Sequence, residues 1–267
     1  MKKLLLGLVS LLLWFGLSSC QSSSNVFDFV LDESYDGFVT MATSADYAPY
    51  EWIVDDGNGK SVVQGVDIEI AKEIARALGK NLRVIHKGFD FLIEDVRNDR
   101  VDFIIAGLTP TPSRAEIIDF SKSYYTEESV TQVVLIHKDD VSLYSNIESL
   151  NVAGKRVGAQ TGAIQVEFAD LFTPLATKKV VADINELMNN LTNKQIDALY
   201  TEGPVAQTRI NAGAPFVQLT LNNVDHYQGN AVGVKKGNTE LLTTINEVID
   251  RLIAEGKIAL WLETYSA

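Results

Sequence analysis

An arginine that follows a predicted strand is the first residue with clear binding chemistry. The segment Thr109-Pro110-Thr111-Pro112-Ser113-Arg114 comes directly after a strand-like run that ends at Ala106-Gly107. Arg114 therefore falls at or near the start of a helix, where its planar guanidinium can hold a carboxylate in a bidentate pair. Gly107 would let a ligand approach the backbone, and Thr109 would supply a hydroxyl. The other interpretation is a surface arginine after a proline-rich turn.

The second half of the chain offers complementary chemistry after two further strand-like runs. Residues 157–165 read as a strand, a glycine turn and the start of a helix, whose backbone amides could receive an anion. The glycine spacing of a Walker or dinucleotide motif is missing, so this is no phosphate loop. Glu202 lies in the loop after another strand, and its carboxylate suits an ammonium group. An ordinary strand-to-helix connection and a solvated glutamate are the alternatives.

Aromatic residues are concentrated near these polar groups. The segment from Asp46 to Trp52 contains three aromatic and two acidic residues, and Phe89 follows another strand. An aromatic face can pack on an aliphatic stem or attract a guanidinium by about 0.5 to 2 kcal/mol. Tyr50 and Trp52 are expected in the core. Tyr47 and Phe89 are the better candidates for the walls of a binding cleft.

Other kinds of chemistry find little support in the sequence. His86, His137 and His226 show no metal-ligand spacing, no Gly-x-Ser-x-Gly motif occurs, and no acid pair lies in a catalytic motif. The formal charge of −12 argues against a nucleic acid partner. We therefore expect a binding protein without a metal, a cofactor or bound nucleic acid.

The N-terminus predicts export and a lipid anchor. Lys2 and Lys3 precede the apolar run Leu4 to Leu17, and the segment Leu17-Ser18-Ser19-Cys20 follows with the only cysteine of the chain. This segment resembles the bacterial lipoprotein signal, which implies a signal peptide at 1–19 and an acylated Cys20. Residues 20–37 are interpreted as the lipidated cysteine and a tether, on the extracytoplasmic side of the cell membrane. An uncleaved anchor helix is the alternative.

The elements that must position these residues alternate between short apolar runs and amphipathic stretches, which predicts an α/β fold. Apolar residues recur every four positions in the predicted helices 66–78 and 239–253, and a shorter helix is expected at 258–265. The predicted strands are 38–43, 82–85, 103–106, 130–136, 156–158, 198–200 and 231–234.

An internal repeat indicates two similar lobes. Residues 94–103 resemble residues 188–198, and both read as the end of a helix entering a strand. Each strand then runs into a small polar loop, 106–109 in one case and 201–204 in the other. Ligands of open α/β sheets bind beyond the C-terminal ends of strands, so these loops are expected to form a shared cleft.

Together the segments resemble solute-binding protein family 3, the polar amino acid-binding proteins of ABC importers, from about Phe38 to Tyr265. The matching segments are Ser44-Ala45-Asp46-Tyr47-Ala48-Pro49-Tyr50-Glu51, Gly65-Val66-Asp67-Ile68-Glu69-Ile70-Ala71, residues 101–114, Ile118-Asp119-Phe120-Ser121 and Gly154-Lys155-Arg156-Val157-Gly158. The resemblance implies a two-lobed periplasmic-binding-protein-like fold of type II, in which each lobe is a mixed sheet flanked by helices. Lobe 1 would comprise 38–125 plus 229–267 and lobe 2 126–228, with hinge crossings near 125–129 and 225–233.

The same resemblance assigns roles to the candidate residues. Arg114 would bind the α-carboxylate of an amino acid, assisted by Thr109 and by the backbone amides of Thr109 and Thr161. Glu202 would bind the α-ammonium group together with the Gly107 carbonyl, although many members carry aspartate at this position. Tyr47 and Phe89 would form the aromatic walls.

The identity of the ligand side chain stays open at this point. Gln160 and the residues after it look more like those of members that bind basic amino acids, which favours arginine or lysine. Ser44 stands where some of those members have aspartate, so a distal acid would come from Asp46, Glu51 or Asp90. We expect a monomer that captures a free amino acid and delivers it to an ABC permease. The alternatives are a glutamine or histidine receptor, a dehydratase of the cyclohexadienyl type, a metal receptor and an adhesin.

Overall fold

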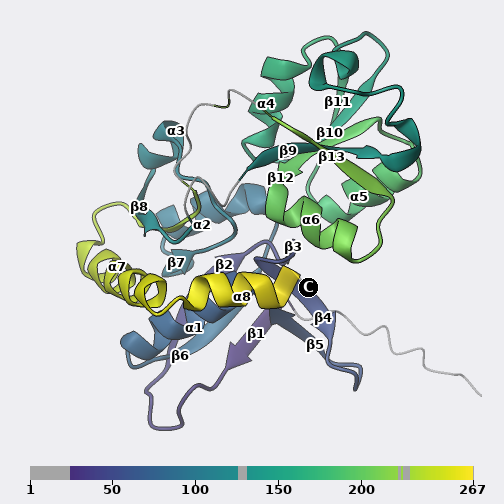
Figure 1. The fold of residues 1–267 in the computed structure, drawn as a ribbon. Helices are drawn as coiled ribbons and strands as arrows, with labels where there is room; N and C mark the ends of the chain where they lie inside the picture. Colours follow the sequence, from purple (N-terminus) through teal and green to yellow (C-terminus); the bar gives the residue numbers. More distant parts are fainter. Residues whose placement is uncertain (1–24, 126–130, 222–223, 225–228, 267) are drawn as a thin grey trace, which may run out of the picture.

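Two lobes, each built on one mixed sheet, form the molecule (Figure 1). The computed structural model describes residues 25–125, 131–221, 224 and 229–266. The sheet of lobe 1 has the strand order β1-β6-β2-β7-β14-β8, and its strands are β1 (Val26–Phe29), β6 (Asn81–His86), β2 (Phe38–Thr43), β7 (Phe103–Ile104), β14 (Ala231–Lys235) and β8 (Ile118–Ser123).

Helices cover both faces of the lobe 1 sheet because successive side chains of a strand point to opposite faces. Met41 of β2 packs in the cluster that contains the apolar stripe of α1, whereas the next residue, Ala42, packs in the cluster that contains Leu92 of α2. The helices of this lobe are α1 (Val66–Ala77), α2 (Leu92–Arg97), α3 (Pro112–Ala115), α7 (Thr239–Ala254) and α8 (Lys257–Ser266). A small antiparallel sheet adds β3 (Asp46–Tyr47), β4 (Glu51–Asp55) and β5 (Ser61–Gln64).

Lobe 2 repeats this arrangement with a sheet of order β11-β10-β12-β9-β13. Leu187 of α5 and Val205 of α6 pack in one buried cluster, and Phe168 of α4 packs in another. The strands are β11 (Thr177–Val181), β10 (Arg156–Gln160), β12 (Ala198–Glu202), β9 (Gln132–His137) and β13 (Phe216–Thr220), and the helices are α4 (Gln165–Phe172), α5 (Ile184–Thr192) and α6 (Gly203–Asn211).

The internal repeat seen in the sequence is the same turn in both lobes. Asp99 after α2 and Lys194 after α5 both have a φ of 54°. The aspartate that follows in each copy then binds the start of the neighbouring strand, because Asp102 accepts the Thr40 N–H at 2.7 Å and Asp197 accepts the Arg156 N–H at 2.8 Å. The repeat therefore fixes how each helix returns to its sheet.

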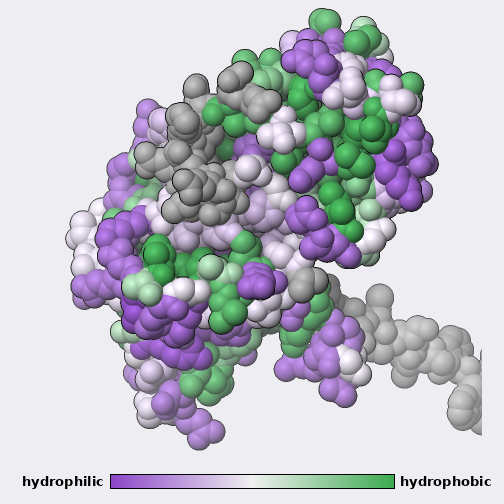
Figure 2. All heavy atoms as spheres, in the orientation of Figure 1, coloured by the Kyte–Doolittle hydropathy of each residue, from purple (hydrophilic) through white to green (hydrophobic). Residues whose placement is uncertain are grey.

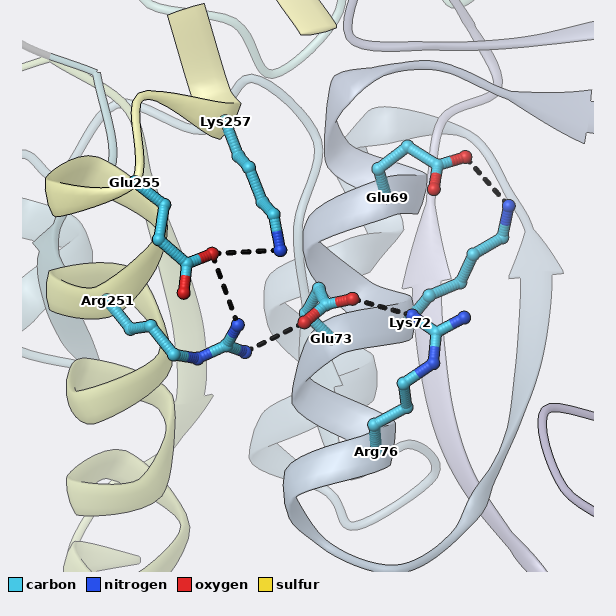
Figure 3. A network of polar contacts seen from close by, with 7 residues as sticks. All are labelled: Glu69, Lys72, Glu73, Arg76, Arg251, Glu255 and Lys257. Carbon is cyan, nitrogen blue, oxygen red and sulfur yellow. Dashed lines mark hydrogen bonds and ion pairs between the residues drawn. The ribbon is translucent and has the colours of Figure 1, made fainter. Parts of the chain in front are cut away.

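The outer helices of lobe 1 are joined by ion pairs (Figure 3). Glu73 of α1 pairs with Arg76 on the same helix and with Arg251 of α7, and Glu255 pairs with Lys257 at the start of α8. Hydrophilic and hydrophobic side chains are interspersed over both lobes on the face seen in Figure 2.

The structure corrects part of the predicted tether. Val26–Phe29 were placed within the tether 20–37, but they form the edge strand β1, which pairs antiparallel with β6. The apolar residues of this segment are compatible with a strand, but the strand is only four residues long and directly follows the serine-rich segment that reads as a tether. Strands β8, β11 and β13 and the β3–β5 sheet are also additions to the predicted set.

Other predictions concern residues outside those that the structure describes. The signal peptide and Cys20 lie outside the described residues, as do residues 126–129 of the first predicted hinge crossing and 225–228 of the second. In the part of the chain that the structure describes, no helix is both long and apolar enough to cross a membrane.

Candidate ligand-binding cleft

A cavity between the lobes collects most of the predicted site residues. It opens partly to solvent, and its empty volume of about 280 Å³ includes this open part and the gaps between the lining atoms. Its lining residues are Tyr47, Phe89, Ala106, Gly107, Thr109, Arg114, Gln160, Ala163, Ile164, Gln165 and Glu202. Residues from both lobes contribute, so the cavity depends on how the lobes meet.

Arg114 lies in the short helix α3, which follows β7 after the loop 105–111. Thr111 caps this helix by accepting the Arg114 N–H at 3.2 Å. The guanidinium donates to the Thr109 carbonyl at 2.6 Å and, across the cleft, to the Gly162 carbonyl at 3.0 Å. It also lies over the Phe89 ring, 5.5 Å from the centroid. A buried cation is thus oriented at the wall of the cavity by both lobes.

Gly107 also lines the cavity, in a conformation that favours glycine. Its φ is 52°, and a Cβ at this position would lie 3.2 Å from the Tyr50 ring and 3.3 Å from the Tyr47 ring. Its N–H donates to Asp67 Oδ2 at 2.7 Å, and the Tyr124 hydroxyl donates to the same oxygen at 3.0 Å. This buried carboxylate on α1 therefore fixes the loop that presents Gly107 to the cavity.

Glu202 brings a carboxyl group to the cavity from the end of β12 in lobe 2. Burial raises its pKa to about 7, assisted by the charge of Asp67, while the Tyr50 hydroxyl, the Asn230 amide and the charge of Arg114 lower it. Asn230 donates to Glu202 Oε2 at 3.4 Å. A positively charged ligand group beside Glu202 would favour its ionised form.

Tyr47 of lobe 1 reaches across the cleft to the same strand end. Its hydroxyl lies 3.2 Å from Thr201 Oγ1, and the Glu202 N–H donates to it at 3.4 Å. Its ring stacks on Tyr50 with the centroids 5.9 Å apart. Tyr47 and Phe89 thus both line the cavity, and their role as aromatic walls for a ligand stays a prediction.

Gln160 connects the cavity to an acid behind it. Its amide nitrogen donates to Asp46 Oδ2 at 3.1 Å and to the Ala182 carbonyl at 2.9 Å. Asp46 also accepts the Ser44 hydroxyl at 2.9 Å and the Ile184 N–H at 3.0 Å. Asp46 and Ser44 therefore lie behind the wall that Gln160 forms.

Three further candidates lie apart from the cavity wall. The Thr161 N–H donates to the Val181 carbonyl at 2.9 Å, so it is used within the lobe 2 sheet. Glu51 is fully buried beside Asp67, which together with burial raises its pKa well above the usual range. Asp90 is exposed in the 3-10 helix Phe89–Phe91.

Four lining residues were missed by sequence reasoning. Ala163, Ile164 and Gln165 line the cavity at the start of α4, and Ala106 lines it after β7. The glycine turn was the available signal for the first three. Spacing alone could not say which amides after Gly162 would face the cleft.

The site therefore combines a buried guanidinium, a buried carboxyl and two aromatic rings. Within residues 25–125, 131–221, 224 and 229–266, no group of three His, Cys, Asp or Glu side chains could hold a metal ion. Two α/β lobes closing on such a cavity define a solute-binding protein of the periplasmic-binding-protein type.

Comparison with known proteins agrees with this class. The family of bacterial extracellular solute-binding proteins, family 3, matches residues 39–267, and the chain belongs to that family. This confirms the predicted family and a role in binding rather than catalysis.

The chain is 30% identical to the arginine-binding extracellular protein ArtP of Bacillus subtilis, over 97% of this chain and 95% of ArtP. It resembles an amino acid ABC transporter substrate-binding protein of Streptococcus pneumoniae bound to L-arginine, with a TM-score of 0.81, 31% identity and coverage of 86% of this chain and 94% of that one. The predicted two-lobed fold is thereby confirmed.

A third solved structure of similar fold is related to the dehydratases, although it is itself an amino acid-binding protein. An ancestral amino acid-binding protein, described as a precursor of cyclohexadienyl dehydratase, has a TM-score of 0.77 and 26% identity, over 86% of this chain and 96% of that one.

Proposed function

We propose that this protein captures free L-arginine outside the cell and delivers it to the permease of an ABC importer. The observation that carries the proposal is that a buried cation, Arg114 of lobe 1, and a buried acid, Glu202 of lobe 2, line the same cavity. A free amino acid is doubly charged and strongly hydrated, so a receptor must replace water at both ends with paired groups. The cavity offers one group of each sign.

The α-carboxylate would bind at Arg114. The guanidinium is already oriented by the Thr109 and Gly162 carbonyls, which reduces the entropy lost when a bidentate pair forms. The Thr109 hydroxyl would assist. Arg114 also contacts both lobes through these two carbonyls, so carboxylate binding and lobe closure would involve the same side chain.

The α-ammonium group would bind Glu202 and the Gly107 carbonyl. Asp67 holds the Gly107 amide and so orients the loop from the far side. The longer side chain of Glu202, compared with the aspartate of many relatives, is supported by Asn230. The ammonium group would also relieve the cost of ionising a buried carboxyl.

The ligand side chain would extend between Tyr47 and Phe89 toward Gln160. Aromatic faces suit both the aliphatic stem and the guanidinium of arginine. Because the Gln160 amide nitrogen serves Asp46 and Ala182, its carbonyl oxygen is the atom suited to accept a ligand N–H. Asp46 is favoured as the distal acid over fully buried Glu51 and exposed Asp90.

Closure of the lobes would signal that the receptor is loaded. A ligand that contacts Arg114 on lobe 1 and Glu202 on lobe 2 stabilises the closed form, which the permease would recognise. The protein would act as a monomer. It would be held at the membrane by acyl chains on Cys20, each buried methylene contributing about 0.8 kcal/mol.

The first experiment is calorimetric titration of residues 25–267, refolded to remove bound ligand, against the twenty amino acids. Arginine binding near the micromolar level, about −8 kcal/mol, would support the proposal. Preferential binding of glutamine or histidine would keep the receptor and replace its ligand. No binding to any of the twenty amino acids would reject arginine as the ligand and point to a different small solute.

The anchor is tested separately by cell fractionation of Cys20→Ala. Release of the variant from the membrane would support lipidation. Continued membrane association would favour an uncleaved helix.

A further inference from the structure

Asp46 joins the two lobes at the edge of the cavity without lining it. It belongs to β3 in lobe 1, where Ser44 donates to its carboxylate. From lobe 2 the same carboxylate receives the Gln160 side chain at 3.1 Å and the Ile184 N–H at the start of α5 at 3.0 Å. Because these two partners belong to the other lobe, the bonds can form only when the lobes are together, and Asp46 is then 8% exposed.

The charge of Asp46 is poorly compensated in this position. Burial raises its pKa to about 6, and the nearby charge of Asp183 acts in the same direction, against the hydrogen bonds from Ile184, Ser44 and Gln160. The cationic Arg209 donates to the Asp46 backbone carbonyl at 3.5 Å and to Asn185 at 2.5 Å, so its charge interacts with that of Asp46 without a direct hydrogen bond to the carboxylate. Closing the cleft therefore buries a carboxylate whose direct partners are all uncharged.

A cation inside the cavity would supply the missing charge. Gln160 lines the cavity and contacts Asp46 directly, so one side chain separates the acid from the ligand. Opposite charges within about 4 to 6 Å favour the ionised form of a buried acid. A neutral ligand of the same shape could make the same hydrogen bonds to Gln160, but it would leave the Asp46 charge uncompensated.

We propose that Asp46 is a positioning residue that selects cationic over neutral ligand side chains, acting through Gln160 on the closure of the lobes. This inference rests on the proposed arginine-binding function and adds the source of its charge specificity. Selection arises where Asp46 of lobe 1 meets Gln160 and Ile184 of lobe 2, because a cationic side chain offsets a further part of the cost of burying the Asp46 carboxylate and a neutral one does not.

The test compares L-arginine with L-citrulline, its neutral isostere, by calorimetric titration. The unaltered protein should bind arginine at least about tenfold more tightly, since a close charge interaction of about 1.4 kcal/mol corresponds to that factor. In Asp46→Asn the side-chain oxygen can still accept the Ile184 N–H while the charge is lost. Arginine affinity should then fall about tenfold or more, with citrulline affinity nearly unchanged, so that the ratio approaches one.

Glu186→Gln is the matched control. Glu186 is an exposed acid in the first turn of the same helix α5, where its carboxylate faces Lys179. This variant removes a negative charge away from Asp46 and should leave the arginine to citrulline ratio within about twofold of the original.

A second variant, Gln160→Met, removes the link between the cavity and Asp46 and should also lower the ratio. Adding Asp46→Asn to it should have little further effect. An unchanged ratio in Asp46→Asn, or equal losses for both ligands, would overturn the inference, and Gln160→Met decides if Asp46→Asn does not fold. Failure of the unaltered protein to bind arginine would overturn the proposed function as well, which the first titration distinguishes.

Discussion

Arg114 illustrates how one residue can be both a ligand group and a contact between lobes. The residue is 9% exposed, and its guanidinium donates to a carbonyl on each side of the cleft. Replacement by alanine should therefore remove the carboxylate partner without opening the core of either lobe.

We expect Arg114→Ala to weaken arginine binding on the order of 100-fold or more, because loss of one partner of a buried charge pair costs about 2 to 5 kcal/mol. Calorimetric titration measures the affinity, and thermal unfolding checks the fold. Arg97→Ala, which removes an exposed arginine paired with Glu94, is the control and should bind normally. Normal affinity in Arg114→Ala would place the carboxylate elsewhere.

Glu202 makes a second prediction at the same scale, on pH. Its pKa is raised by burial to about 7 in the ligand-free protein. The stability that protonated Glu202 contributes is thus present below its ordinary pKa and declines as pH rises through about 7. An ammonium ligand reverses this preference because it binds the ionised carboxylate.

The stabilisation of the protein by saturating arginine should therefore grow between about pH 5.5 and pH 8, with proton release on binding at the lower end. Thermal unfolding with and without arginine, and titration in buffers of different ionisation enthalpy, measure the two effects. Glu202→Gln should flatten the profile, whereas Glu240→Gln, an exposed change on α7, should leave it intact. A profile that is unaltered in Glu202→Gln would assign the titration to another acid.

At the scale of elements, the two longest amphipathic helices could be predicted from the sequence. The helix expected at 66–78 is α1, and the one expected at 239–253 is α7. Both could be predicted because apolar residues at helical spacing form a stripe that packs against the core. β11 was missed because it is an edge strand without a fully buried residue, so its sequence carries no apolar run. Residues gathered across the lobes, such as Asp46 and Gln160, depend on closure and have no local signal.

The repeated helix-to-strand turn predicts a stability effect. Asp197 Oδ2 accepts the Arg156 N–H at 2.8 Å, and Oδ1 accepts the Tyr144 hydroxyl at 3.0 Å. Although burial raises the pKa of Asp197, these bonds and the Arg156 side chain hold it below the usual value. Its ionised form therefore stabilises lobe 2 at neutral pH.

We expect Asp197→Ala to lower the free energy of unfolding by about 2 to 3 kcal/mol, since hydrogen bonds to charged groups contribute about 1.5 to 3 kcal/mol. Urea denaturation at pH 7 measures this, and the difference should shrink as the acid protonates below about pH 4. Asp170→Ala, which removes an exposed ion pair with Lys178, should cost less than about 1 kcal/mol. Equal costs in the two variants would contradict a structural role for the repeated aspartate.

At the scale of the whole molecule, function depends on how closely the lobes meet. Gly162 of lobe 2 approaches the chain of lobe 1 at Asp90, and its carbonyl receives Arg114. Its φ is 78°, and an added Cβ would lie 3.0 Å from Asp90 Cα. A methyl group there would push against backbone, so the lobes would have to separate slightly.

Gly162→Ala should therefore weaken arginine binding by about tenfold or more and reduce the compaction that arginine induces, because the fully closed form is strained. Titration calorimetry and small-angle X-ray scattering measure the two quantities. Gly154→Ala is a close control, because Gly154 lies in the same lobe at a φ of 90° with nothing within 4 Å of an added Cβ. Both variants carry the local cost of alanine at positive φ, about 1 kcal/mol or more, so a binding defect confined to Gly162→Ala reports on closure alone. Equal defects would mean that affinity follows the stability of lobe 2 and that the seam at Gly162 has no separate part in holding the ligand.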